Sequence, residues 1–160
     1  MRPMRIIGID PGLARTGWGV IAALSPQRMR FVACGVVATD AGADLAVRLA
    51  ALDAGLAAVL AAHTPAVAAV EETYVNRNPA SALKLGQARG VCVLAPARAG
   101  VPVREFAPAV IKKALTGTGR AEKGQIALMV RRLLPGCGEP KEDAADALAV
   151  ALTCAFQGMP

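Results

Sequence analysis

Histidine and cysteine, which supply many catalytic and metal sites, are scarce in this chain: there are one histidine and four cysteines. Zinc sites usually contain closely spaced pairs of these residues, and disulfide-stabilised domains are denser in cysteine. The single histidine also argues against a Ser-His-Asp triad or a histidine-rich metal site. Since His63 lies at the expected C-terminal end of a helix, where a cation is favourable, we expect it to be structural. The widely separated cysteines are expected to be free, buried thiols: Cys34, Cys92, Cys137 and Cys154.

Long uncharged apolar stretches are also missing, although 54% of the residues are hydrophobic. Much of this content is alanine, and acidic residues such as Asp53 and Asp146 interrupt the candidate stretches, so no membrane segment is predicted. The first ten residues contain too short an apolar run for a signal peptide. We therefore expect a cytoplasmic protein. The length of 160 residues, without a linker or repeat, predicts a single domain over residues 1–160.

Positive charge is concentrated in the second half of the chain. Residues 1–75 contain six basic and six acidic side chains, whereas residues 76–160 contain twelve basic and six acidic ones. The formal net charge of +6 therefore arises after residue 75. Such a basic half is typical of proteins that bind a polyanion. A solvated basic surface would give the same composition, so charge alone does not choose between the two interpretations.

Apolar runs of strand length and segments with helical periodicity alternate along the chain. Residues 66–70 are apolar on both faces, which indicates a central strand. Three strands followed by alternating helices and strands predict an α/β fold, with a five-stranded mixed sheet flanked by helices. In order, we expect strands at residues 5–9, 17–23 and 29–37, a helix at 44–62, a strand at 66–70, a helix from 78 to about 95, a strand at 101–106, and helices at 109–115, 123–134 and 140–156.

Four acidic residues occupy positions from which a metal site can be built. Asp10 and Glu71 each end an apolar strand, and Asp143 and Asp146 are three residues apart near the start of the last helix. Acids in a first helical turn also favour the helix dipole, but this explanation fits Asp146 poorly because it lies further along the helix. Neighbouring carboxylates disfavour one another's ionisation unless cations neutralise them. Oxygen ligands suit Mg²⁺ or Mn²⁺ better than zinc. The four acids are therefore candidate metal ligands.

Four motifs occur in register along the chain. They are GIDPG at residues 8–12 with TGWG at residues 16–19, SALKLGQARG at residues 81–90, AEK at residues 121–123, and DAADALA at residues 143–149. Together they resemble the RuvC-type Holliday junction resolvases, and the resemblance covers nearly the whole chain. The opening motif alone would be a weak signal, whereas four motifs in order make a strong one.

The resemblance implies a ribonuclease H-like fold and a homodimer that acts on four-way DNA junctions in recombination and repair. Such enzymes nick two strands of like polarity and leave 5′-phosphate and 3′-hydroxyl ends. The implied cofactor is Mg²⁺, with Mn²⁺ as a substitute and two ions per active site. Strand alternation cannot choose between Glu71 and Glu72, which face opposite sides, but the family pattern favours Glu71. The implied ligands and catalytic acids are Asp10, Glu71, Asp143 and Asp146, and the implied protein partner is the RuvA–RuvB branch-migration complex.

Basic and aromatic residues near these motifs are expected to act on DNA. Lys123 is expected to take part in catalysis, by adding positive charge at the scissile phosphate or by assisting proton transfer. Tyr74 is expected to stack on unpaired bases, and packing on its own loop is the alternative. Any of the lysines could instead be a solvated surface charge. The expected DNA contacts are Tyr74, Arg77, Lys84, Lys112, Lys113 and Arg120.

Two further patterns concern assembly and departures from the family. Gly86 and Gly90 are four residues apart on one expected helix, and the resemblance favours a dimer contact there over ordinary helix packing. Leu13 and Ala14 stand where relatives often carry a Ser-Arg pair, which puts a DNA contact at these positions in doubt. Trp18 replaces a frequent tyrosine.

Two other functions remain open from the sequence. Actin-like ATPases and sugar kinases also begin with a strand, an Asp and a glycine-containing turn, but they need two such domains around the nucleotide. A basic module that binds junctions without cutting them would use the acids only to hold the fold. Such a module has little reason to bring like charges together, so the intact set of four acids favours the nuclease.

Overall fold

The computed structural model describes residues 2–73 and 78–158. Its strands and helices follow the predicted order, with boundaries that differ by one to three residues. The elements are β1 (Met4–Asp10), β2 (Arg15–Ser25), β3 (Arg28–Ala38), α1 (Leu45–His63), β4 (Val67–Glu71), α2 (Pro79–Arg98), β5 (Val103–Phe106), α3 (Pro108–Thr116), α4 (Lys123–Leu133) and α5 (Glu142–Phe156).

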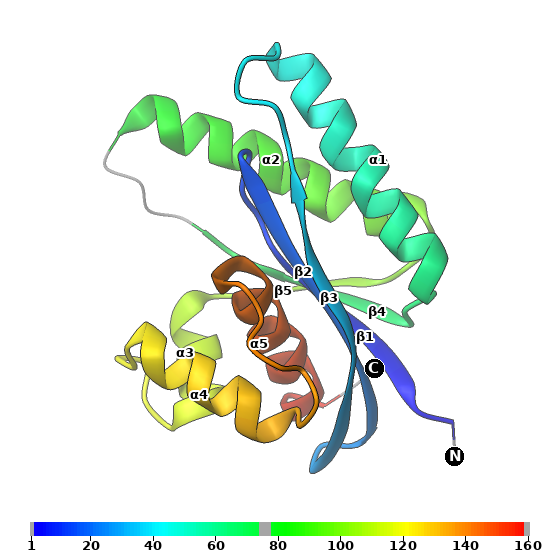
Figure 1. The fold of residues 1–160 in the computed structure, drawn as a ribbon, viewed down its shortest axis with the longest axis vertical. Helices are drawn as coiled ribbons and strands as arrows, with labels where there is room; N and C mark the ends of the chain where they lie inside the picture. Colours follow the sequence, from blue (N-terminus) through cyan, green and yellow to red (C-terminus); the bar gives the residue numbers. More distant parts are fainter. Residues whose placement is uncertain (1, 74–77, 159–160) are drawn as a thin grey trace.

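The five strands form one mixed sheet in the order β3-β2-β1-β4-β5. β1, β2 and β3 pair antiparallel as a meander, whereas β4 is parallel to both β1 and β5. Helices α1 and α2 cover one face of the sheet, and α3, α4 and α5 lie on the other (Figure 1). The predicted fold class is therefore confirmed.

Each sheet face has its own hydrophobic core. On one face, Ile7 and Ile9 of β1 pack with Leu52 and Leu56 of α1. On the other, Ile6 packs with a second cluster to which α5 contributes most. Helix α5 is buried from Ala144 to Ala155 except at the half-buried Asp146, as its nearly continuous apolar surface predicts.

Glycines allow α5 to approach the sheet closely. A Cβ atom at Gly8 of β1 would lie 2.0 Å from the carbonyl oxygen of Ala147, and one at Gly17 of β2 would lie 1.9 Å from that of Asp143. Any larger side chain would push the helix away from the strands. The glycines of the opening motif therefore fix the position of the helix that carries two of the four acids.

Helix α2 extends past its predicted end. The prediction placed the end near Ala95, but the helix includes Pro96 and continues to Arg98. The carbonyl oxygen of Pro96 accepts a hydrogen bond from the backbone N–H of Val101, which follows the helix, at 2.9 Å. The start of the helix is as predicted, because the Asn78 side chain accepts a hydrogen bond from the N–H of Ala80 at 3.0 Å.

Helix α1 corrects one expectation. Its 19 residues have a mean hydropathy of 1.9, so among the described helices it is long and apolar enough, by length and composition only, to cross a membrane. Its two charged side chains, Arg48 and Asp53, do not offset the many alanines. In the folded chain α1 packs on α2 and β3, and Asp53 pairs with Arg98 of α2.

The predictions for the histidine and the cysteines are confirmed only in part. His63 is the last residue of α1, and its ring lies 5.6 Å from that of Trp18. All four cysteines are free thiols, of which Cys92 and Cys154 are buried, whereas Cys34 and Cys137 are partly exposed. The expectation that every thiol would be buried is therefore wrong for the last two, which lie at the edge of a core.

Candidate active site

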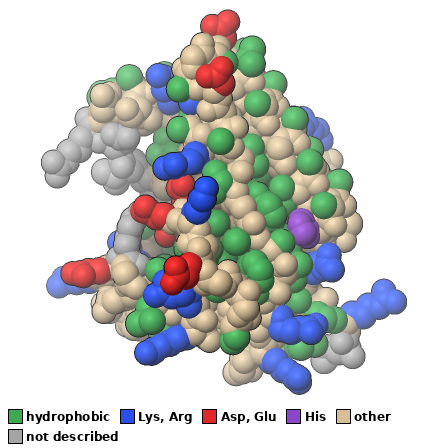
Figure 2. All heavy atoms as spheres, viewed as in Figure 1, with side chains coloured by type: hydrophobic (Ala, Val, Ile, Leu, Met, Phe, Trp, Pro, Cys, Tyr) green, Lys and Arg blue, Asp and Glu red, His purple; other side chains and the backbone are tan. Residues whose placement is uncertain are grey.

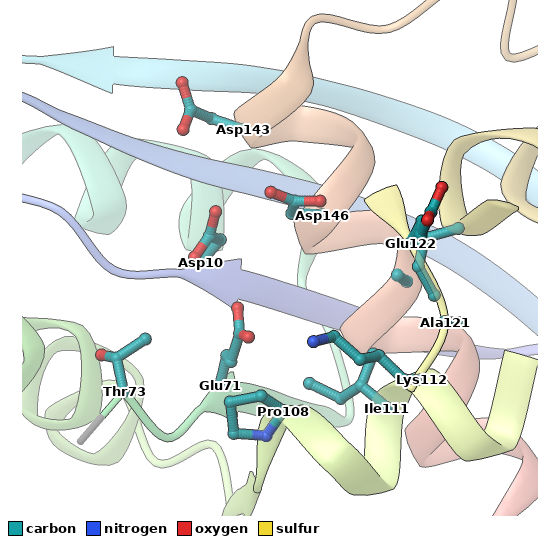
Figure 3. A pocket seen from close by; sticks show the side chains of 12 residues that line it. Asp10, Glu71, Thr73, Pro108, Ile111, Lys112, Ala121, Glu122, Asp143 and Asp146 are labelled. Atoms are coloured by element: carbon teal, nitrogen blue, oxygen red, sulfur yellow. The ribbon is translucent and has the colours of Figure 1, made fainter. Parts of the chain in front are cut away.

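The four acids predicted from sequence line one pocket of about 590 Å³ (Figure 3). Asp10 and Glu71 are the last residues of β1 and β4, which are parallel neighbours with Ile9 paired to Val70. Their side chains therefore emerge side by side at the same edge of the sheet. Asp143 and Asp146 approach from α5, and Figure 3 shows all four carboxylates around one space.

The structure distinguishes the two adjacent glutamates. Val67 and Ala69 of β4 pack in the core beneath α5, so by alternation Glu71 faces the same side as they do. Gly8 meets α5 as well, which places Asp10 on that side. Glu71 lines the pocket. The Glu72 backbone N–H donates to the carbonyl of Phe106 at 2.9 Å, which continues the pairing with β5.

The acids strongly perturb one another. The pKa of Asp10 is raised to about 9, mainly by burial and further by the negative charges of Glu71, Asp146 and Asp143. A side-chain hydrogen bond with Glu71 adds to the effect. Without a cation, Asp10 therefore holds a proton at neutral pH. Strongly raised pKa values of this kind are typical of functional sites.

An arginine that sequence reasoning missed completes the rim. The Nε atom of Arg15, the first residue of β2, lies 3.3 Å from the Oδ2 atom of Asp143. The arginine side chain is 69% exposed, so the pair lies at the boundary with solvent. The only sequence signal was its place beside Leu13 and Ala14, where relatives often carry a basic residue.

The donor chemistry of the pocket fits Mg²⁺ or Mn²⁺, because four carboxylates supply only oxygen ligands. Among the described residues, no group of three Asp, Glu, His or Cys side chains is already arranged to hold an ion. The raised pKa of Asp10 and its side-chain hydrogen bond with Glu71 indicate a proton shared between these two carboxyl groups. Binding an ion therefore requires loss of that proton and small movements of the surrounding carboxylates.

One predicted basic residue reaches the pocket. Lys112 of α3 is half-buried, lines the pocket, and directs its amino group towards the acids in Figure 3. Lys84, Lys113 and Arg120 are exposed and do not line it. Lys123 begins α4, directly after Glu122 at the pocket wall, but its side chain lies outside the described part of the chain.

Some of the predictions are not tested, and some residues were missed. Tyr74 and Arg77 lie outside the described residues. Thr73 and Glu122 line the pocket but were not predicted as site residues, although Glu122 lies within the AEK motif. Among the described residues, the Thr73 hydroxyl is buried without a hydrogen-bond partner.

The departures from the family pattern have a simple structural basis. Leu13 is 8% exposed and packs in the core beneath α1, so it is a core residue rather than a DNA contact. Ala14 is exposed, and its carbonyl accepts from the N–H of Thr39 at 3.1 Å. Trp18 packs against the same core as Leu13.

A mixed five-stranded sheet with acids at the ends of two central strands and on an adjacent helix defines the ribonuclease H-like class of nucleases. The family model for "Crossover junction endodeoxyribonuclease RuvC" matches residues 6–154. The chain therefore belongs to the RuvC family of crossover junction endodeoxyribonucleases, which are metal-dependent nucleases.

Curated relatives and solved structures agree with this assignment. The chain is 59% identical over 157 residues to the enzyme of Azorhizobium caulinodans, covering 98% of this chain and 92% of that one. It is 62% identical over 148 residues to the enzyme of Acidiphilium cryptum, covering 92% and 88%. Thermus thermophilus RuvC, solved in complex with a Holliday junction substrate, is 39% identical with a TM-score of 0.90 and coverage of 96% and 94%. The yeast mitochondrial Holliday junction resolvase shares only the fold, with 15% identity and a TM-score of 0.68.

Proposed function

We propose that this protein is a structure-selective endonuclease that resolves four-way DNA junctions during homologous recombination and repair. It nicks two strands of like polarity and leaves 5′-phosphate and 3′-hydroxyl ends. The observation that carries the proposal is the pocket in which Asp10, Glu71, Asp143 and Asp146 meet. Further support comes from the similarity to the Thermus thermophilus enzyme in its junction complex.

The four acids are the proposed metal ligands and catalytic acids. Asp10 and Glu71 are held by β1 and β4, so they form the rigid side of the site. Asp143 and Asp146 lie on the first turns of α5, which is buried against the sheet. When bound, two Mg²⁺ ions, with Mn²⁺ as substitute, would neutralise the attacking and leaving oxygens of a phosphodiester. The negative charges gathered around the buried Asp10 attract cations to the pocket.

Basic residues are proposed to bind the DNA backbone around this pocket. Lys112 is proposed to contact the phosphate nearest the acids, because it lines the same pocket. Lys123 is proposed to add positive charge at the scissile phosphate or to assist proton transfer. Tyr74 is proposed to stack on an unpaired base close to the crossover. The remaining proposed phosphate contacts are Arg77, Lys84, Lys113 and Arg120, together with Arg15.

A homodimer formed through α2 is also proposed. Leu83 and Leu94 of this helix are 64% and 53% exposed, although both are large apolar residues. They are eleven residues apart, so they lie on one helical face, which Gly86 and Gly90 continue. A Cβ atom at either glycine would meet nothing within 4 Å, so the backbone of this face is open to close approach. Two-fold symmetry would place two pockets on matching strands of a junction.

The place of action and the protein partner follow from the same proposal. An enzyme of this family acts on DNA in the bacterial cytoplasm, which agrees with the cytoplasmic expectation. The RuvA–RuvB branch-migration complex remains the proposed partner at the junction. A single domain over residues 1–160 is proposed to be sufficient for catalysis.

A synthetic mobile four-way junction provides the direct test. With Mg²⁺, the protein is expected to make paired, symmetric nicks whose products can be religated. Linear duplex of the same sequence serves as the control substrate. Equal cutting of the linear duplex would indicate a general nuclease, and junction binding without nicking would indicate a binding module. ATP binding measured by calorimetry would favour the ATPase alternative.

A further inference from the structure

A second pocket, of about 580 Å³, lies at the opposite end of β1 from Asp10. Three arginines line it, Arg2, Arg5 and Arg30, and its other lining residues are uncharged. Figure 2 shows basic side chains gathered at the end of the molecule where the N-terminus lies, with no described acidic side chain among them on the face drawn. We call this site the arginine pocket.

Strand pairing places two of the arginines on the same surface. Arg5 of β1 is paired with Ala22 of β2, which is paired in turn with Arg30 of β3. Residues directly opposite in antiparallel strands point to the same face, so both arginines rise from one face. Two strand spacings separate their backbones by about 10 Å. The small side chain of Ala22 leaves the space between them open.

The charge of the arginine pocket is not balanced within the described chain. The Nη1 atom of Arg5 donates to the carbonyl oxygen of His63 at 2.9 Å, at the C-terminal end of α1. The side chains of Arg2 and Arg30 form no hydrogen bond or ion pair with any residue that the structure describes. Positive side chains that line one pocket repel one another unless an anion lies between them. Guanidinium groups bind carboxylates in a bidentate geometry.

The same surface borders an open strand edge. β3 is the outer strand of the sheet, and over its 11 residues no position is fully buried. The interstrand backbone hydrogen bonds described for β3 are all with β2. An outer strand with unpaired N–H and C=O groups accepts an extended peptide as an additional strand. Arg30 to Val32 belong both to this edge strand and to the arginine pocket.

The arginine pocket lies away from the four acids and from the DNA strand that they are proposed to cut. Asp10 faces α5, whereas Arg5 is displaced from it by an odd number of residues on β1 and therefore faces the α1 side. The two sites also lie at opposite ends of a seven-residue strand, about 20 Å apart. The sheet therefore lies between the arginine pocket and DNA bound at the four acids.

We propose that the arginine pocket and the adjoining edge of β3 bind an extended acidic segment of a partner protein. The segment pairs its backbone with the outer edge of β3. Its Asp or Glu side chains, which alternate along one face, enter the arginine pocket. The open edge supplies affinity that does not depend on sequence, and the arginines select acidic segments.

A labelled decapeptide of alternating Glu and Val tests the proposal by fluorescence anisotropy. The variant Arg2→Glu/Arg30→Glu is expected to bind this peptide at least about tenfold more weakly than the natural chain, because two attractions become repulsions. The control Arg131→Glu/Arg132→Glu changes the net charge equally on the exposed surface of α4 and is expected to bind normally. Equal weakening by both variants would overturn the proposal, since it would show a general charge effect.

Two further measurements address the edge and the alternative partner. The same peptide N-methylated at alternate residues loses strand pairing but keeps its charge, and it is expected to bind at least about tenfold more weakly. Unchanged binding of this peptide would overturn the β3 contact. Arg2→Glu/Arg30→Glu is expected to keep wild-type affinity for a four-way junction and wild-type nicking. A tenfold loss of junction affinity, absent from the Arg131→Glu/Arg132→Glu control, would identify the pocket as a DNA contact and overturn the proposal.

Discussion

The Nε atom of Arg15 lies 3.3 Å from the Oδ2 atom of Asp143. If Asp143 is a metal ligand, as proposed, this guanidinium group would compete with the metal ion for the same carboxylate. Because the arginine is largely exposed, the competition is weak and is worth about 0.2–1 kcal/mol. The pair holds Asp143 at the rim until a stronger cation replaces the arginine.

Replacement of Arg15 by glutamine tests this competition. Arg15→Gln is expected to lower the Mg²⁺ concentration for half-maximal nicking by about two- to fivefold, in line with an exposed ion pair. A Mg²⁺ titration at saturating junction DNA gives the midpoint. Arg132→Gln, an exposed change on α4, serves as the control. A higher midpoint in Arg15→Gln would mean that the arginine assists ion binding instead.

Loss of the Asp10 carboxylate should separate cutting from binding. Asp10→Asn is expected to reduce nicking by at least about a hundredfold while junction affinity stays within about twofold, since the amide keeps the shape but not the charge. Single-turnover nicking and a gel-shift titration measure the two quantities. Asp40→Asn removes an exposed acid that does not line the pocket and should behave as wild type. Wild-type nicking by Asp10→Asn would show that the active site is elsewhere.

The raised pKa of Asp10 makes the stability of the metal-free protein depend on pH. Its pKa is about 9 in the fold, against an ordinary value of 3.8. The folded state therefore binds the proton more tightly, and this contribution to stability is fully present below about pH 4 and is lost as the pH rises through about 9. In EDTA, the melting temperature of the natural chain should fall over this range more steeply than that of Asp10→Asn. Parallel curves would contradict the assignment of the raised pKa.

Divalent ions should offset the loss of stability that the metal-free protein shows as the pH rises. An ion competes with the proton on Asp10, so added Mn²⁺ is expected to raise the melting temperature more at about pH 8.5 than at about pH 6. Differential scanning fluorimetry with and without Mn²⁺ provides the measurement. Asp10→Asn should show a much smaller rise at both values. An equal rise in the variant would show that the ion binds at another site.

The close contact between Gly8 and Ala147 predicts a strict requirement for glycine. Gly8→Ala is expected to lower the free energy of unfolding by about 2–4 kcal/mol, because its methyl group would lie 2.0 Å from the Ala147 carbonyl oxygen and would displace α5. Urea unfolding measures the change. Gly124→Ala is the matched control, since a methyl group there meets nothing within 4 Å. Similar stabilities of the two variants would contradict the packing of α5 on β1.

Substitutions on α2 test the proposed dimer. Leu83→Glu is expected to shift the protein from dimer to monomer, because it places a charge in the middle of an apolar contact. Val47→Glu, on α1, is the control, since Val47 is 59% exposed and Leu83 is 64% exposed. Light scattering at micromolar concentration gives the mass. A monomeric natural chain, or a dimeric Leu83→Glu, would contradict the proposed interface.

Much of the fold could be predicted because its signals are local. Apolar runs and turn residues mark each strand, and the uniformly apolar surface of the last helix predicts its burial. The sequence also pointed to the acids, since Asp10 and Glu71 end their strands. The choice between Glu71 and Glu72 required the family pattern, because both neighbours satisfy the local rule. The structure makes this choice, because the alternation of side chains along β4 directs Glu71 towards α5.

Other features depend on contacts between distant segments, which local patterns do not record. Arg15 and Asp143 are far apart in sequence, and only the approach of α5 to Gly17 brings them together. In the sequence, Leu13 stands where relatives often carry a polar residue, but in the fold it packs in a hydrophobic core. The arginine pocket joins three strands through pairing register, so no single segment of the sequence marks it.

Helix α5 follows all five strands in the sequence and supplies half of the acid set. A nascent chain that has already folded its sheet still lacks two of the four carboxylates until this helix leaves the ribosome and inserts against Gly8 and Gly17. Folding of the sheet alone therefore does not assemble the set of four acids. A chain truncated before α5 is expected to lack nicking activity for the same reason.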